Sequence, residues 1–121
     1  MTSELKRVIL EMGTGNDLYG EDYTKAGTRA VQDALHHSSL SLFRTLGLDR
    51  DAMQVEVTVA VQQPDKVDKQ QVAAQIPYGD VVVNAVHGGL NIVDDDNGVV
   101  SVIATAAVAA RLMLPDGKFR L

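Results

Sequence analysis

Ten consecutive residues alternate between apolar and mostly polar side chains, and no other stretch constrains the fold as strongly. Residues 53–62 read Met-Gln-Val-Glu-Val-Thr-Val-Ala-Val-Gln. Successive side chains of a strand point to opposite faces of a sheet, so this period of two residues predicts a β-strand. The valine face is expected to be buried, and the other face is expected to meet solvent, a ligand or another subunit.

Three further strands are predicted from apolar runs. Residues 5–12 predict a first strand that ends at Gly13. Residues 80–87 predict another strand, and because both of its faces are apolar we expect it to lie in the centre of the sheet. Residues 99–114 favour a long last strand that pairs with residues 80–87, although the propensity of residues 104–112 also allows a helix.

Two helices and a tight turn connect these strands. Alanines and leucines at helical spacing predict a helix over residues 24–46, kinked near Ser38. A short helix is expected over residues 67–75, ended by residues 77–79 (Pro-Tyr-Gly). Residues 94–98 (Asp-Asp-Asp-Asn-Gly) predict a solvated turn, because Asn-Gly tolerates positive φ and the run lacks the calcium-loop pattern.

The predicted element order is β-α-β-α-β-β in one α+β domain, residues 1–121, with a loose C-terminal tail over residues 115–121. Two helices on one face of a mixed four-stranded sheet satisfy this order. The opposite face carries apolar or neutral residues on its last two strands and has no predicted helix to cover it. We therefore expect a homo-oligomer in which a second subunit covers that face.

Charge and composition argue against several classes of function. A formal net charge of −5 disfavours nucleic acid as a partner, because its phosphates require a basic patch. The chain has no cysteine, which removes disulfides and thiolate chemistry and fits a cytoplasmic location. No signal peptide is recognisable, and the longest weakly polar run, residues 98–110, is shorter than the ~20 residues of a membrane span. A cytoplasmic protein with no membrane partner is expected.

The densest set of special residues lies between the first strand and the first helix. Gly13 and Gly15 follow the strand, but the next glycine, Gly20, comes too late for a dinucleotide-binding fingerprint. These glycines could serve only to allow a tight turn. We favour the alternative that their amides and the following helix N-terminus form a nest for a carboxylate or another oxyanion.

Charged residues accompany these glycines. Asp22 or Thr24 is expected to cap the helix, and both are candidates to contact a ligand. Lys25 and Arg29 lie one turn apart on the same helical face, where together they could grip an anion. Lys25 opposes the helix dipole, so it is either simply solvated or tuned by this position for chemistry. Asp17 is expected to balance the two cations or to act as a base.

Other candidate groups lie outside this loop. Glu56 is in the middle of the alternating strand, either as a solvated residue or as a site carboxylate in a subunit cleft. His87 ends a strand, and it is either a structural histidine or a general acid or base. Gly88 and Gly89 follow it, and their amides could be free to bind a ligand. No spacing of histidine and carboxylates reaches the standard of a metal site, so no metal is predicted.

The chain resembles a small family of uncharacterised proteins of about this length. The resemblance rests on Met12-Gly13-x-Gly15-x-Asp17-x-x-Gly20-x-Asp22-x-Thr24-Lys25-Ala26 and on the later Gly88-Gly89-Leu90. Where that family typically has a histidine and a glutamine around Gly20, this chain has Tyr19 and Glu21. More distantly, it is similar to the chorismate-mutase-like and RidA-like fold, and to the domains of ring-opening amidohydrolases. This similarity implies a trimer with ligand pockets at its subunit interfaces.

Two hypotheses of function follow. The first is an enzyme, or an enzyme-like protein, that acts without an organic cofactor on a small polar metabolite such as a cyclic amide or a carboxylate. Hydrolysis, cyclisation or isomerisation would suit it. Lys25 and Arg29 would hold the ligand, glycine amides would bind an oxyanion, and Asp17, Glu56 or His87 would move a proton. The alternative is a non-catalytic module for ligand binding or assembly.

Overall fold

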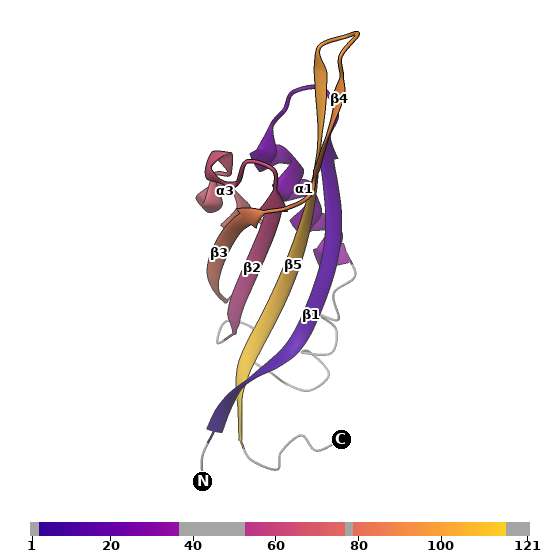
Figure 1. The fold of residues 1–121 in the computed structure, drawn as a ribbon. Coiled ribbons are helices and arrows are strands. Elements are labelled where there is room, and N and C mark those ends of the chain that lie inside the picture. Colours follow the sequence, from indigo (N-terminus) through magenta and orange to yellow (C-terminus); the bar gives the residue numbers. More distant parts are fainter. Residues whose placement is uncertain (1–2, 37–52, 77–78, 116–121) are drawn as a thin grey trace.

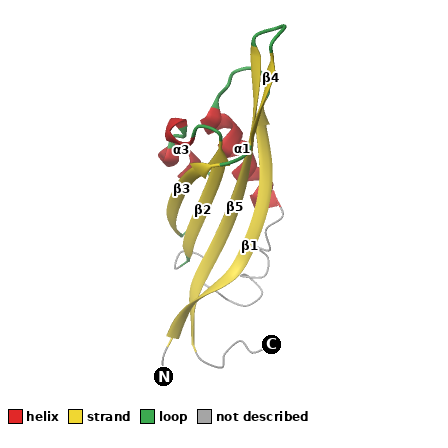
Figure 2. Cartoon of the chain, viewed as in Figure 1, coloured by secondary structure: helices red, strands yellow, loops and turns green. Residues whose placement is uncertain are grey.

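The computed structural model describes residues 3–36, 53–76 and 79–115, which form one α+β domain with a five-stranded mixed sheet (Figure 1). The helices lie on one face of this sheet (Figure 2). The elements in chain order are β1 (Ser3–Asp17), α1 (Tyr23–His36), β2 (Gln54–Val61), η2 (Pro64–Lys66), α3 (Lys69–Ala73), β3 (Asp80–His87), β4 (Leu90–Asp94) and β5 (Val99–Pro115).

The long strand β5 is the centre of the sheet. The strand order is β1-β5-β2-β3, and β4 pairs with β5 beyond the end of β2. β5 runs antiparallel to β1, β2 and β4, whereas β2 and β3 are parallel. The β4–β5 hairpin extends past the rest of the sheet (Figure 1). β1 and β3 are therefore the outer strands of the body of the sheet.

The core lies between α1 and the sheet and consists mainly of valine and alanine. Ala26, Ala30 and Ala34 lie fully buried along α1. They bring the helix onto the backbone of β1, where a Cβ added at Gly13 would lie 2.5 Å from the carbonyl oxygen of Ala30. Such contact requires glycine in the strand, because any side chain would push the helix away. The predicted buried face of β2 is confirmed by Val55, Val57, Val59 and Val61.

The first strand is longer than predicted, and the sheet has one strand more. β1 continues through Gly13 to Asp17, so the predicted end at Gly13 was wrong. Pairing with β5 and close packing under α1 keep these glycines in the strand despite their low β-propensity. The fifth strand, β4, was not predicted because its five residues merge with the Gly88-Gly89 break and the acidic turn.

The third predicted strand has its predicted bounds as β3, but its position was wrong. It is an outer strand that pairs with β2 alone among the described residues. Its two faces are apolar for different reasons: Val81, Val83 and Ala85 pack against the core, whereas Val82 and Val86 are exposed. The last strand is confirmed as β5, but it pairs with β1, β2 and β4 rather than with β3.

The helices and the hairpin turn follow the predictions where they are described. The predicted long helix is confirmed as far as His36, and its second part lies outside the described residues, as does the tail from residue 116. The short helix predicted over residues 67–75 is confirmed as the shorter α3, and the turn η2 that precedes it was not predicted. The turn after β4 is confirmed, with Gly98 at φ 65°. The side-chain amide of Asn97 donates to Asp94 at 2.8 Å and lowers the pKa of that carboxyl.

We call the sheet face opposite α1 the open face; it carries the odd-numbered β5 residues from Ser101 to Arg111. Cross-strand partners point to the same side of a sheet, so the pairing registers identify which side chains share this face. A shallow hollow of about 430 Å³ lies there, lined largely by small residues such as Thr58, Ala60 and Ala107. The exposed large apolar residues of the open face are Leu10, Met12, Val82, Val86, Leu90 and Ile92.

Candidate functional site

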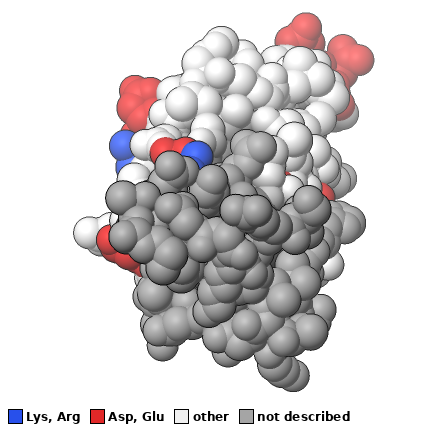
Figure 3. All heavy atoms as spheres, turned by 90° about the horizontal axis from the view of Figure 1, so that it is seen from below, with Lys and Arg blue, Asp and Glu red and all other residues white. Residues whose placement is uncertain are grey.

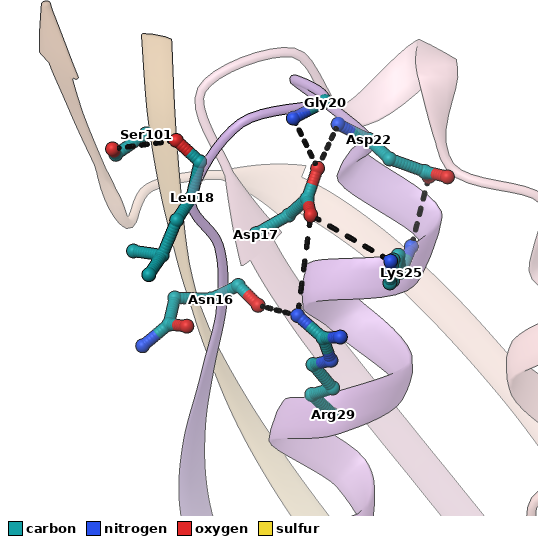
Figure 4. Close-up of polar contacts among 8 residues, drawn as sticks. All are labelled: Asn16, Asp17, Leu18, Gly20, Asp22, Lys25, Arg29 and Ser101. Atoms are coloured by element: carbon teal, nitrogen blue, oxygen red, sulfur yellow. Dashed lines mark hydrogen bonds and ion pairs between the residues drawn. The ribbon is translucent and has the colours of Figure 1, made fainter. Parts of the chain in front are cut away.

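The carboxylate of Asp17 organises the loop between β1 and α1. Its side chain is almost fully buried, and Oδ2 accepts hydrogen bonds from the backbone N–H groups of Gly20 (3.1 Å) and Asp22 (2.9 Å) (Figure 4). A Cβ at Gly20 would lie 2.8 Å from that same oxygen, so glycine lets the chain approach the carboxylate. Glu21 lies between these two donors with a φ of 48°, an uncommon conformation for a residue other than glycine.

The second oxygen of Asp17 faces two cations on α1. Oδ1 is 3.9 Å from both Lys25 Nζ and Arg29 Nη1 (Figure 4). Arg29 Nη1 also donates to the carbonyl oxygen of Asn16 at 2.6 Å. The lysine and arginine side chains are 52% and 46% exposed, whereas the carboxylate is 8% exposed. Asp17 thus holds both cations on their buried side, and about half of each cationic side chain is open to solvent. We call Asp17, Asp22, Lys25 and Arg29 the cation site, after its two cationic side chains, Lys25 and Arg29.

The start of α1 is fixed by hydrogen bonds of the Asp22 carboxylate and the Thr24 hydroxyl. Asp22 caps the helix, because its Oδ1 accepts the backbone N–H of Lys25 at 2.9 Å. Thr24, the other predicted cap, instead accepts the N–H of Asp68 at 2.8 Å and donates to the Lys66 carbonyl at 3.3 Å. Thr24 therefore ties α1 to the segment before α3, and its buried hydroxyl faces away from solvent.

Gly13 and Gly15 do not form an open nest of amides. The N–H of Thr14 donates to Asp33 and the carbonyl of Asn16 accepts from Arg29, so the main-chain groups of Thr14 and Asn16 point away from β5. Because directions alternate along an antiparallel strand, the main-chain groups of Gly13 and Gly15 point towards β5. We therefore leave both glycines out of the proposed ligand site.

Glu56 is remote from the cation site. It lies on the open face of β2, where its Oε1 is 3.7 Å from Arg111 Nη1. Glu56 pairs with Ala109 of β5, whereas Asp17 pairs with Val102 of the same strand. Measured along β5, the positions of Glu56 and Asp17 are therefore about 23 Å apart. The structure does not bring these two carboxylates together.

His87 and the two following glycines lie at another corner of the sheet. The exposed His87 ends β3, separated from β1 by β2 and β5. Gly88 donates its N–H to the Val61 carbonyl at 2.9 Å, and the carbonyls of both glycines accept from Gln62 Nε2. Gly89 has a φ of 63° and passes close to Ile103. These residues guide the chain from β3 across the end of β2 to β4.

Sequence reasoning did not single out a polar cluster around the buried hydroxyl of Tyr23. This oxygen accepts from Gln63 Nε2 (3.1 Å) and Asn91 Nδ2 (2.8 Å) and donates to Glu21 (3.3 Å). Asn91 Oδ1 is buried and has no hydrogen-bond partner within the described part of the chain. The cluster joins α1 to the ends of β2 and β4. Ser101 adds another link, because its hydroxyl donates to the Leu18 carbonyl at 3.0 Å.

Acidic side chains accompany the basic ones on the molecular surface. In the view of Figure 3, the few basic atoms of described residues lie beside acidic ones. Within residues 3–36, 53–76 and 79–115, no group of three or more histidines and carboxylates is arranged to hold a metal ion. None of the described helices combines the length and apolar character that a membrane crossing would need.

Fold and site together define a single-domain α+β protein in which a buried aspartate holds a lysine and an arginine at the start of the first helix. The chain belongs to the Lin0512 family of conserved hypothetical proteins, whose model matches residues 7–110. This confirms the predicted membership of an uncharacterised family. A crystal structure of an FtsZ-like protein of unknown function from Nostoc punctiforme is similar, with 32% identity and a TM-score of 0.81. The match covers 93% of this chain and 100% of that one. No curated protein matches.

Proposed function

We propose that this protein binds a small anionic ligand of the carboxylate class at the cation site. The observation that carries the proposal is the convergence of Lys25 and Arg29 on one buried carboxylate, with about half of each cationic side chain still exposed. The Asp17 carboxylate faces the two cations with its negative charge on their buried side. A ligand carboxylate arriving from solvent would meet both cations without displacing the hydrogen bonds that hold Asp17 Oδ2.

The chemistry of the two cations favours such a ligand. A guanidinium binds a carboxylate through parallel hydrogen bonds, and a lysine adds a mobile point charge. Arg29 is anchored to the Asn16 carbonyl by Nη1, which fixes the guanidinium before any ligand arrives. A cation that is already positioned loses less conformational freedom on binding. The site therefore favours small anions over extended polyanions, in keeping with the acidic net charge of −5.

An enzymatic form of this proposal requires a proton carrier inside the site. Of the predicted candidates Asp17, Glu56 and His87, only Asp17 lies beside the two cations. Its carboxylate already faces two amides and two cations, and this arrangement favours holding a ligand over moving a proton. We therefore place ligand binding first, and hydrolysis, cyclisation or isomerisation of a cyclic amide or carboxylate second. The proposal includes no organic cofactor.

A second candidate function is assembly, and the open face favours it. Apolar patches larger than about 300–600 Å² on a soluble monomer commonly mark contact surfaces. Six exposed large apolar residues share the open face with the hollow, which is lined largely by small residues. A homo-oligomer that covers the face, such as the trimer implied by the resemblance to the chorismate-mutase-like and RidA-like fold, remains part of this proposal.

Thermal unfolding of the full chain with malonate tests the binding proposal. Malonate is a small dicarboxylate, and malonamide is its uncharged counterpart of similar shape. At a hundredfold excess over Kd, binding stabilises the native state by about 2.7 kcal/mol. We expect malonate to raise Tm by several degrees and malonamide to leave it unchanged. Succinimide extends the comparison to a cyclic imide, and new product signals in its NMR spectrum would support the enzymatic form.

Lys25→Ala is the decisive variant in this experiment. We expect it to fold with nearly the wild-type Tm and to weaken malonate binding at least tenfold. Lys69→Ala is the matched control, because it removes the same charge from α3 and should keep the full response. Equal stabilisation of Lys25→Ala and wild type by malonate would refute the site, and unfolding of Lys25→Ala would show that the lysine is structural.

A further inference from the structure

The two outer strands of the sheet are protected to different degrees. At the edge of β1, the N–H of Thr14 donates to Asp33 Oδ2 at 2.9 Å, and the carbonyl of Asn16 accepts from Arg29. The pairing of β1 also has a register shift between Arg7 and Ile9. Side chains that occupy edge groups and irregular pairing both hinder the addition of another strand. The edge of β1 is thus guarded by α1 and by its own irregularity.

Within the described part of the chain, the outer edge of β3 has no comparable protection. Asp80 and Gly88 donate their N–H groups to the carbonyls of Met53, which precedes β2, and of Val61, which ends it. Main-chain groups alternate in direction along a strand, so the N–H and C=O groups of the odd residues from 81 to 87 point outward. Among the described residues no strand pairs with this edge. Its pairing with β2 is regular over eight residues, and its sequence contains neither proline nor lysine.

We propose that β3 pairs with β3 of a second copy in antiparallel orientation, around a two-fold axis at Asn84. Hydrogen-bonded positions in such a pair must both point outward, which limits the register to even shifts. An axis at Asn84 uses all four outward residues, placing Val81 opposite His87 and Val83 opposite Ala85. This register joins two five-stranded sheets into one continuous sheet.

The side chains of β3 suit this self-pairing. On the open face, Val82 of one copy lies opposite Val86 of the other, so two exposed apolar residues cover each other. The only carboxylate of the strand, Asp80, is at its first residue, so the two copies place these charges at opposite ends of the contact. Two chains that each carry a net charge of −5 therefore meet along an edge without juxtaposed like charges. This favours a second copy over a basic peptide as the occupant.

A single engineered cysteine tests the register directly, because the chain has no cysteine of its own. In the proposed dimer the two copies of Asn84 occupy a non-hydrogen-bonded pair, with Cα atoms about 4.5 Å apart. This separation lies within the range of a disulfide. Under mild oxidation of the full chain, Asn84→Cys should form a covalent dimer at least tenfold faster than Val82→Cys.

Val82→Cys is the matched control, on the same strand and face, and Val82 is 56% exposed. Its two copies would be about 13 Å apart in the proposed register, too far for a disulfide. Equal rates for the two variants, or faster cross-linking of Val82→Cys, would overturn the proposal. Because neither position touches the cation site, the result is independent of malonate binding.

A pair of double variants examines the same contact without cysteine. Val82→Lys with Val86→Lys places lysine opposite lysine at two positions, whereas Val82→Lys with Val86→Glu places lysine opposite glutamate. Sedimentation of the full chain should show a dimer, or a larger even-numbered oligomer if the open face also assembles, for wild type and for the lysine–glutamate variant. The lysine–lysine variant should dissociate at least tenfold more readily. A monomeric wild type at 100 µM, or equal dissociation of the two variants, would contradict the proposal.

Discussion

Gly15→Ala is expected to destabilise the protein by about 3 kcal/mol, at the upper end of the usual cost of overpacking. A Cβ at this position would overlap the backbone nitrogen of Ala30 and lie 2.5 Å from the carbonyl oxygen of Ala26. Both atoms belong to the main chain of α1, so no side chain can rotate away to make room. The helix must lift from β1 and expose part of the valine and alanine core. Chemical denaturation measures the loss as a lower midpoint with an unchanged slope.

Gly98→Ala is the control for the glycine itself. Nothing lies within 4 Å of a Cβ built at Gly98, although its φ of 65° disfavours a side chain. The expected cost is therefore about 1 kcal/mol of backbone strain. If Gly15→Ala costs no more than Gly98→Ala, the close contact between α1 and β1 does not exist as described.

Asp17→Ala is expected to cost about 3 kcal/mol, because a buried acceptor is removed from several donors at once. The N–H groups of Gly20 and Asp22 lose their hydrogen-bond partner, and Lys25 and Arg29 lose their shared counter-charge. The two amides account for most of this cost. The cations are about half exposed, so water screens their share of the loss.

Two substitutions separate the parts of this effect. Asp17→Asn keeps one oxygen that can accept from the amides but removes the negative charge, so we expect it to cost less than Asp17→Ala. Asp95→Ala removes a carboxylate from the exposed hairpin turn and should change the unfolding free energy by less than about 0.5 kcal/mol. A loss of less than about 1 kcal/mol for Asp17→Ala would mean that Asp17 does not organise the loop.

The sequence predicts the parts of the fold whose packing environment is uniform along the element. β2 follows its alternation because one of its faces is buried along its whole length and the other face stays open. β3 differs because apolar residues on both faces are typical of a central strand, yet Val82 and Val86 are exposed. Gly13 and Gly15 indicated a loop because local propensity does not reveal that a helix will lie across them.

The same distinction applies to the site. Lys25 and Arg29 are one helical turn apart, so their shared direction follows from spacing alone, and Asp17 is close to them in the chain. The contacts of the Tyr23 hydroxyl could not be foreseen in this way. Gln63 and Asn91 are 40 and 68 residues away, and only the sheet topology brings them to α1. Glu56 and His87 are polar residues of suitable chemistry that the topology places elsewhere.

An NMR titration of the full chain with malonate, at constant ionic strength, tests the central claim most directly. Backbone amide shifts report where on the molecule the anion binds, without assuming any reaction. We predict that the largest changes occur at Gly20, Asp22, Lys25 and Arg29, that they saturate together, and that Lys25→Ala removes them. Saturating changes confined to another part of the molecule, or no saturable change at any amide, would contradict the assignment of the cation site as the ligand site.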